Sequence, residues 1–351
     1  NLSLNEVNYL LNPLNFSINI SAKNSKILLE DKSLDLSDIT TNISLKNFIK
    51  NQFSIDDLKI STKEIQIKDL ISLTRAVKGS PQLFVLDNIT KEGLISANIN
   101  LAFDLDGEIK KNYQINGAIK KAKFNIFNQV EVENLSLSFN ISKNQLSLRE
   151  IETDLNNIRL KSPLIKIEKK KKIFFIDGKV TNNQKNFDID KLKPILGDLL
   201  NTIEIEKIDF NSVNTFSFNV NKNLKLNDLK LETNLNLKNF KIVKNPFNLK
   251  AFLPNYTEQV KLEDHKIKIK ITKDILDIKG NGNIHIGDDL EQLSYSIIND
   301  DGKIAFDIKF NIKNNPLIIN FLDYKKKQAE SSEILLKGIY KKNKELVFQI
   351  I

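Results

Sequence analysis

Hydrophobic and polar residues alternate along most of this chain. Between Leu94 and Leu105 apolar side chains occupy every second position from Ile95, and most residues between them are serine, asparagine or aspartate. Successive side chains of a β-strand point to opposite faces, so this pattern predicts a strand with one apolar and one polar face. The same alternation recurs at Leu135, Leu137, Phe139, Ile141; Phe216, Phe218, Val220; Leu229, Leu231, Leu235, Leu237; Ile267, Ile269, Ile271; Ile304, Phe306, Ile308, Phe310, Ile312; Ile334, Leu336, Tyr340; and Leu346, Phe348, Ile350.

Short pairs of turn-forming residues separate the predicted strands. They are Asp106-Gly107, Asn116-Gly117, Lys143-Asn144, Lys222-Asn223, Asn281-Gly282 and Asp301-Gly302. A tight turn joins antiparallel strands, whereas a parallel crossover needs about a dozen residues or more. The sequence therefore predicts an antiparallel meander.

The first of the few helical patterns covers Lys68–Lys78. Asp69 is a suitable N-cap, and apolar residues at helical spacing follow it. Gly79 and Pro81 are expected to end this helix.

Two further helices are predicted later in the chain. Asp188–Asn201 has an apolar stripe, and Pro194 places the start of that helix near Asp190 or Leu192. Pro246–Val260 is the third candidate, interrupted by a proline. Because the first two candidates are each followed by a run of strands, we interpret the chain as a degenerate repeat of a helix and a long meander.

These elements predict a mostly β fold. The expected architecture is a long curled antiparallel sheet that forms an open, repeating β-groove, with two or three short helices. Its expected parts are a strand segment at 1–67, a helix-plus-meander unit at 68–187 and a second such unit at 188–351, all in one continuous array.

One-sided strands must have their apolar face covered. A second sheet, closure of the sheet on itself, or lipid tails held in an open trough would each do this. In a trough, each methylene removed from water contributes about 0.8 kcal/mol at nearly every position, so a lipid could slide without a deep trap. The residues expected to line the trough are Ile99, Leu101, Phe103, Leu105, Leu135, Leu137, Phe139, Ile141, Phe216, Phe218, Val220, Phe306, Ile308 and Phe310.

Composition excludes some partners and chemistries. The net charge is +9, but only Arg75, Arg149 and Arg159 of the 53 basic residues are arginine. Nucleic-acid sites usually use arginine for bidentate contacts, so we expect no nucleic-acid partner and attribute the basicity mainly to codon bias and to solvated strand faces. Weak attraction to anionic lipid headgroups is the alternative. With no cysteine there is no disulfide, and the lack of methionine suggests a segment of a longer protein.

No pattern of catalytic residues stands out. The two histidines, His265 and His285, lie in strand patterns, and no G-x-S-x-G nucleophile motif is present. Asp104–Gly107 and Asn299–Gly302 lack the glutamate that would complete a calcium loop, so turns are expected there. We therefore expect no enzyme activity, no cofactor and no metal.

Two glycine- or lysine-rich stretches also have simple structural interpretations. Gly280–Asn283 lacks the ending of a phosphate-binding loop, so a turn or bulge is expected. Lys169–Lys172 and Lys325–Lys327 could contact phosphate headgroups, but charged turns or guarded strand edges are the preferred interpretation.

The stretch from Leu70 to Ile126 resembles the AsmA-like proteins of Gram-negative cell envelopes, in particular their YhdP-type members. The shared features are a short helix, a strand start at Gly93, a turn at Phe103–Gly107 and an N-G-x-I/L turn at Asn116–Ile119. The likeness extends to about residue 245. It departs from the family pattern at Ile203–Ile208, where a glycine is expected before the new strand.

The resemblance implies a function without catalysis. It implies a periplasmic segment, anchored in the inner membrane by a helix outside this chain, that carries phospholipid to the outer membrane. Its partners would be phospholipid acyl chains and, through other regions, both membranes. The alternatives are a structural or adhesive β-sandwich of the envelope and an assembly factor for outer-membrane proteins.

Overall fold

The structure is a computed structural model that describes residues 2–29, 32–45, 54–77, 80–104, 106–126, 130–183, 204–221, 223, 225–244, 249–257, 259–273, 275–341 and 347–349. The chain forms two compact units. Unit 1 comprises Asn1–Asn157 and Lys161–Phe175, and unit 2 comprises Ile158–Leu160 and Ile176–Ile351. The expected parts 1–67, 68–187 and 188–351 remain a prediction.

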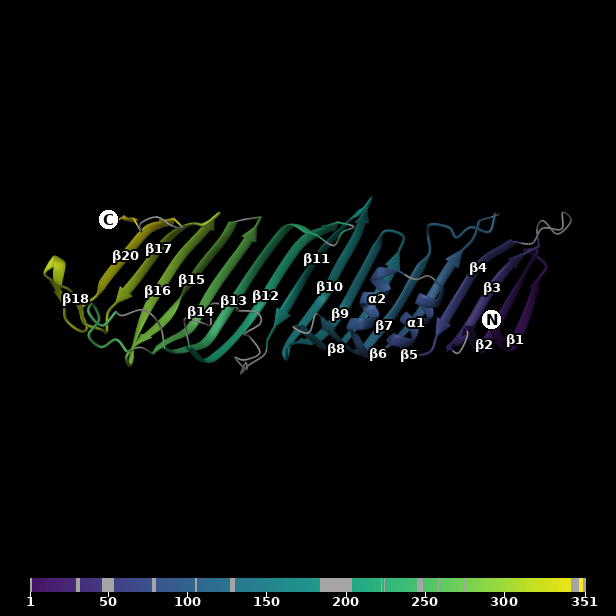
Figure 1. The fold of residues 1–351 in the computed structure, drawn as a ribbon, viewed down its shortest axis with the longest axis horizontal. Helices are drawn as coiled ribbons and strands as arrows, with labels where there is room; N and C mark the ends of the chain where they lie inside the picture. The colour runs from purple at the N-terminus through teal and green to yellow at the C-terminus, as the bar shows by residue number, and fades with distance from the viewer. Residues whose placement is uncertain are drawn as a thin grey trace. The chain divides into compact units, whose positions relative to one another are not determined.

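Unit 1 is an antiparallel meander (Figure 1). From β1 to β4, and again from β6 to β9, each strand pairs with the next one along the chain, and β4 and the short β5 both pair with β6. Its strands are β1 Leu2–Asn12, β2 Ser17–Leu29, β3 Lys32–Ser44, β4 Ser54–Thr62, β5 Ile65–Gln66, β6 Thr90–Ala102, β7 Gln114–Ile126, β8 Val130–Ser142 and β9 Gln145–Leu155. Two strands have residues in both units: β10 Ile158–Lys170 and β11 Ile173–Asn182.

Unit 2 repeats this architecture. Its strands are β12 Glu204–Asn221, β13 Leu226–Lys244, β14 Val260–Thr272, β15 Ile275–Ile286, β16 Asp289–Asp300, β17 Lys303–Ile312, β20 Ser332–Lys341 and β21 Val347–Gln349. A separate two-stranded hairpin, β18 Leu317–Ile319 and β19 Tyr324–Lys326, interrupts the meander after β17 and carries the 3-10 turn η3, Asn320–Leu322.

The predicted fold class is confirmed in both units. Each is a curled antiparallel sheet that stays open in the described part of the chain, because β1 pairs only with β2 and β21 only with β20.

The helices differ from the prediction in one informative respect. α1, Ile67–Val77, is the predicted first helix, but a second helix, α2 Pro81–Ile89, follows it directly. Ser80 caps α2 by accepting a hydrogen bond from the Leu83 amide. Pro81 occupies the first turn of α2, where a backbone N–H would have no partner within the helix, so the N–H that proline lacks is not needed there. α1 ends at Val77, before Gly79 and Pro81, as expected, but Pro81 also begins a second helix that the sequence did not predict.

The other two predicted helices have different outcomes. Residues 188–201 lie outside the described residues. The third candidate was wrong where it is described, since residues 249–257 form successive turns. There the amides of Phe252 and Leu253 both donate to the Leu249 carbonyl.

Two predicted glycine turns are also wrong. Asn116-Gly117 lies within β7, and Asn281-Gly282 lies within β15. A Cβ at Gly117 would lie 2.4 Å from Cζ of Phe139, so this glycine makes room for an aromatic ring on the neighbouring strand. Gly282 makes room for His265 in the same way. These glycines serve cross-strand packing rather than turns.

Bulges mark where strict alternation breaks. Lys121, Asn134, Glu150 and Asp264 have positive φ, and each coincides with a register shift between paired strands. A bulge inserts one extra residue and bends the strand. Apolar positions across a bulge are consequently three residues apart, as with Ile119 and Ala122.

The N-cap of α2 gives a first testable prediction. We expect Ser80→Ala to destabilise unit 1 by about 1 kcal/mol, because the Leu83 amide loses its acceptor. Urea denaturation followed by circular dichroism would measure the change. Thr74→Ala is the control, since its hydroxyl donates only to a carbonyl of its own helix, Leu70 O; equal stability of S80A and wild type would contradict the capping role.

Candidate functional site

A continuous apolar row crosses unit 1. Directly opposed residues of an antiparallel pair share one face of the sheet. Following the register from β2 to β9 gives one such row: Ala22, Ile39, Ile60, Ile99, Ile115, Ile141 and Leu146. The first two are buried, and the remaining five are only partly buried.

The opposite face of the same strands is polar. Its matching row is Lys23, Asp38, Ser61, Asn98, Asn116, Asn140 and Ser147. Asn140 donates a side-chain hydrogen bond to Asn116 across two of these strands. In unit 2 the polar face carries cross-strand ion pairs, such as Lys309 with Glu333. These ion pairs are exposed to solvent, so they contribute little to the stability of the sheet although they contain many of its charged residues.

Unit 2 carries equivalent apolar rows. One runs through Leu235, Ile267, Gly280, Tyr295, Ile308 and Leu336, and the next through Thr233, Ile269, Ile278, Ile297, Phe306 and Gly338. The isoleucines and Phe306 are partly exposed. Apolar side chains therefore line one face of both sheets.

The structure brings the predicted lining residues of unit 1 together on this face. Ile99 and Ile141 flank Ile115 in the row already described, and Leu101 lies opposite Leu58. Phe139 lies opposite Gly117 and Leu148. Phe103 forms an isolated bridge with Ile109 at the end of β6. Leu105 lies outside the described residues.

In unit 2 the predicted lining residues share a face but form two separate groups. Phe216 and Phe218 on β12 stack with ring centroids 5.9 Å apart, and Val220 follows them. Phe306, Ile308 and Phe310 lie on β17, beyond β13 to β16. Sequence alternation missed the residues between the groups that complete the face, which are those on β15 and β16.

In unit 1 the helices cover one end of the apolar face. Ile67 and Ile71 of α1 form a buried cluster with Ala122 of β7, and Ile95, Ile119, Phe124 and Leu135 pack against it. Leu137 is also buried. Figure 1 shows α1 and α2 lying against β5 to β7. Of the predicted lining residues, Leu135 and Leu137 thus contribute to the protein core.

In unit 2 irregular chain performs the same covering role. Leu253 and Tyr256, from the turns before β14, form a buried cluster with Ile286, Ile312 and Leu317. Phe310 packs against this cluster. The middle of the apolar face, from Ile267 to Ile308, lies outside it, so the protein's own core covers only one end of the strands.

The polar face has shallow depressions of its own. One of them has a volume of about 560 Å³, and most of its lining residues come from rows on the polar side, including Lys266, Lys268 and Lys279. Lys268 pairs with Glu232 at 2.7 Å, and Lys279 lies 3.7 Å from Asp277. Two of its three lysines thus lie close to carboxylates.

Both histidines contact neighbouring side chains of the sheet. His285 lies 2.7 Å from Glu263, and this hydrogen bond, reinforced by Lys261, lowers the pKa of the Glu263 carboxyl. His265 is fully buried on the other face and stacks on Tyr295, with ring centroids 5.6 Å apart. Among the described residues no three histidine, cysteine, aspartate or glutamate side chains gather in a way that could hold a metal ion.

The buried His265 predicts a dependence of stability on pH. Burial lowers the pKa of its imidazole below 6.5, and the Asn283 backbone opposes this only partly. The unfolded chain therefore binds a proton more readily, and stability is lost as the pH falls below about 6.5, by at most about 1.4 kcal/mol per pH unit. Denaturation of wild type and His265→Phe between pH 7.5 and 5 would measure it. Equal losses in both proteins would contradict the prediction.

Neither helix in the described part of the chain has the length and apolar character needed to cross a bilayer. Comparison with known proteins does not test the AsmA-like resemblance, which remains an expectation from the sequence. No protein-family model, no curated protein and no solved structure matches this chain.

Proposed function

We propose that this chain binds phospholipid acyl chains on its apolar face and lets them move along it. It acts without catalysis, as the periplasmic segment of an AsmA-like bridge between the inner and outer membranes. Regions outside this chain make the membrane attachments, including an anchor in the inner membrane.

The continuity of the apolar rows is the observation that carries the proposal. The row from Ala22 to Leu146 crosses seven strands without a charged residue. With strands spaced about 4.8 Å apart, such a row is about 29 Å long. Aliphatic side chains offer an acyl chain similar contact energy at each strand, at about 0.8 kcal/mol per buried methylene, so movement along the row meets no deep trap.

The way the face is covered favours this function over a β-sandwich. In a sandwich a second sheet packs about 10 Å away over the whole apolar face. Here α1 in unit 1 and the segment around Leu253 in unit 2 pack over one end of the strands. Partly exposed residues such as Ile99 and Ile278 lie beyond that cover.

Lipid content tests the proposal directly. The chain, purified without detergent from a bacterial envelope fraction, should carry phospholipid in native mass spectrometry. After delipidation it should take up phospholipid from vesicles. A folded protein that carries no lipid and takes none up would refute the proposal.

A further inference from the structure

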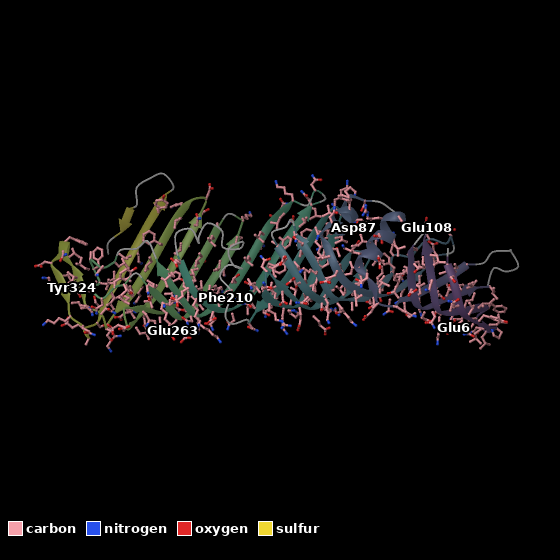
Figure 2. All side chains as sticks on the ribbon, turned by 60° about the horizontal axis from the view of Figure 1, so that its bottom comes forward. Glu6, Asp87, Glu108, Phe210, Glu263 and Tyr324 are labelled. Carbon is pink, nitrogen blue, oxygen red and sulfur yellow. The ribbon has the colours of Figure 1, made fainter. Side chains whose placement is uncertain are left out.

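The hairpin β18–β19 presents two large apolar side chains to solvent. Phe321 is 74% exposed and Leu322 is 63% exposed, and both lie in the 3-10 turn at its tip. Figure 1 shows β18 at the edge of unit 2, and Figure 2 labels Tyr324, which pairs with Ile319 next to the turn. Apolar groups placed together at the end of a projection need an explanation, because folding alone would favour burying them.

The strand that leads into the tip packs against the core of unit 2. Leu317, at the start of β18, is 1% exposed and belongs to the buried cluster of unit 2. Ile319 packs against the same cluster. Leu317 and Ile319 are two residues apart, so they share one face of β18, and their packing anchors this strand at the start of the turn.

Two buried charges also hold the hairpin. The Nζ of Lys326 donates hydrogen bonds to the carbonyls of Asn315, Lys313 and Lys327, at 2.6, 3.2 and 3.1 Å. Lys325 and Lys326 lie on the edge strand β19, in line with one of the two expectations for this run, but Lys326 is buried rather than solvated. The carboxylate of Glu291 accepts hydrogen bonds from the amides of residues 313, 314 and 315.

Burying a charge is unfavourable unless its hydrogen bonds are satisfied. Lys326 and Glu291 both meet this condition, and both fix the loop at Lys313–Asn315 from which the hairpin rises. Rigid support means that little ordering entropy is lost when the tip engages a partner. The tip is therefore preorganised by the hydrogen bonds and packing at its base.

The chemistry of the tip fits a lipid surface. Tyr324 is an exposed aromatic residue close to Phe321 and Leu322, and the exposed Lys325 and Lys327 follow it along the chain. Against these, Asp323 is the one acidic residue between Leu317 and Lys327. Aromatic and aliphatic side chains enter the boundary of the acyl region, while lysines attract anionic headgroups.

We propose that the Phe321–Leu322 tip inserts into the interface of a bilayer containing anionic phospholipid. A convex projection of two apolar side chains is too small for a stable protein interface, which buries on the order of 1,000 Å² or more. The proposal stands independently of lipid binding on the apolar face, because the tip lies outside the rows that carry that function.

Tryptophan fluorescence tests the insertion, since the chain has no tryptophan of its own. In the full chain, Phe321→Trp should shift its emission to the blue by about 10 nm on addition of phosphatidylcholine vesicles with roughly a third phosphatidylglycerol. Lipids brominated on the acyl chain should quench this emission. Ile298→Trp, at an exposed position on the polar face of β16 opposite Asp277, is the matched reporter and should shift much less.

Flotation of the full chain with the same vesicles completes the test. Phe321→Ser with Leu322→Ser should reduce the bound fraction about tenfold, and Lys325→Glu with Lys327→Glu should reduce it only on anionic vesicles. A folded Phe321→Trp protein with no shift and no quenching would overturn the proposal. A shift that depends on protein concentration without vesicles, with dimers in sedimentation, would also overturn it in favour of a second copy. Lipid uptake by the serine variant reports separately on the apolar face.

Discussion

Glutamates placed along one apolar row are expected to weaken lipid contact in unit 1 at least about tenfold. The variant Ile99→Glu, Ile115→Glu and Ile141→Glu puts three carboxylates in direct cross-strand register on β6, β7 and β8. An acyl chain on this row would have to desolvate at least one charge, which costs several kcal/mol. Each 1.4 kcal/mol lowers binding tenfold, so a loss of at least about tenfold is expected.

Cross-linking from a neighbouring position measures this loss locally. A photoreactive phenylalanine at Leu101, which lies opposite Leu58 on the same face, should cross-link to phospholipid in the otherwise unchanged protein. The three glutamates should reduce the yield about tenfold. Their partial exposure in the native sheet means that the β-sheet circular dichroism should persist.

The chain offers a control with the same charge on the same strands. Asn98, Asn116 and Asn140 are in register with one another on the polar face. Replacing all three by glutamate adds the same repulsion between strands but leaves the apolar row intact. This variant should retain the cross-link. Equal yields from the two variants, both folded, would show that the apolar row is not where lipid binds.

The sequence predicts the strands well because one physical pattern dominates it. With one face apolar and the other polar, a strand such as β14 can be recognised from Ile267, Ile269 and Ile271 alone. Strand order follows equally, since short turns such as Asp301-Gly302 allow only antiparallel neighbours. The fold class therefore depends on local information.

Features set by neighbouring strands were not predictable in the same way. Gly117 resembles a turn residue in sequence, and only the Phe139 ring on β8 explains it. The bulge at Asp264 shifts the apolar pattern from Leu262 to His265, which alternation alone treats as an irregularity. The cap at Ser80 did have a local signal, since a serine before a proline is a common helix start.

The covered end of the candidate site was also beyond sequence reasoning. Alternation places Leu135 and Phe139 on one face but cannot say which of them α1 covers. Chain that is neither helix nor strand covers the face in unit 2, and its apolar residues Leu253 and Tyr256 follow no period. Which part of an apolar face stays open thus depends on contacts distant in sequence.

Gly93→Ala is expected to destabilise unit 1 by about 2–4 kcal/mol. Gly93 has φ of +136°, which L side chains rarely adopt. A Cβ there would lie 2.7 Å from the backbone Cα of Ala122 and 2.9 Å from Cδ1 of Ile67. Since Ile67 and Ala122 belong to the cluster that docks α1 on the sheet, the added methyl group must displace the helix or bend β7.

Gly107→Ala separates backbone strain from this close packing. Gly107 also has positive φ, +81°, but a Cβ there meets no atom within 4 Å. Only strain remains, so the expected loss is about 1 kcal/mol. Urea denaturation measures both losses, and hydrogen exchange of the α1 amides should rise in Gly93→Ala but not in Gly107→Ala. If both variants lost the same stability with α1 still protected, the contact between Gly93 and Ala122 would not hold the helix in place.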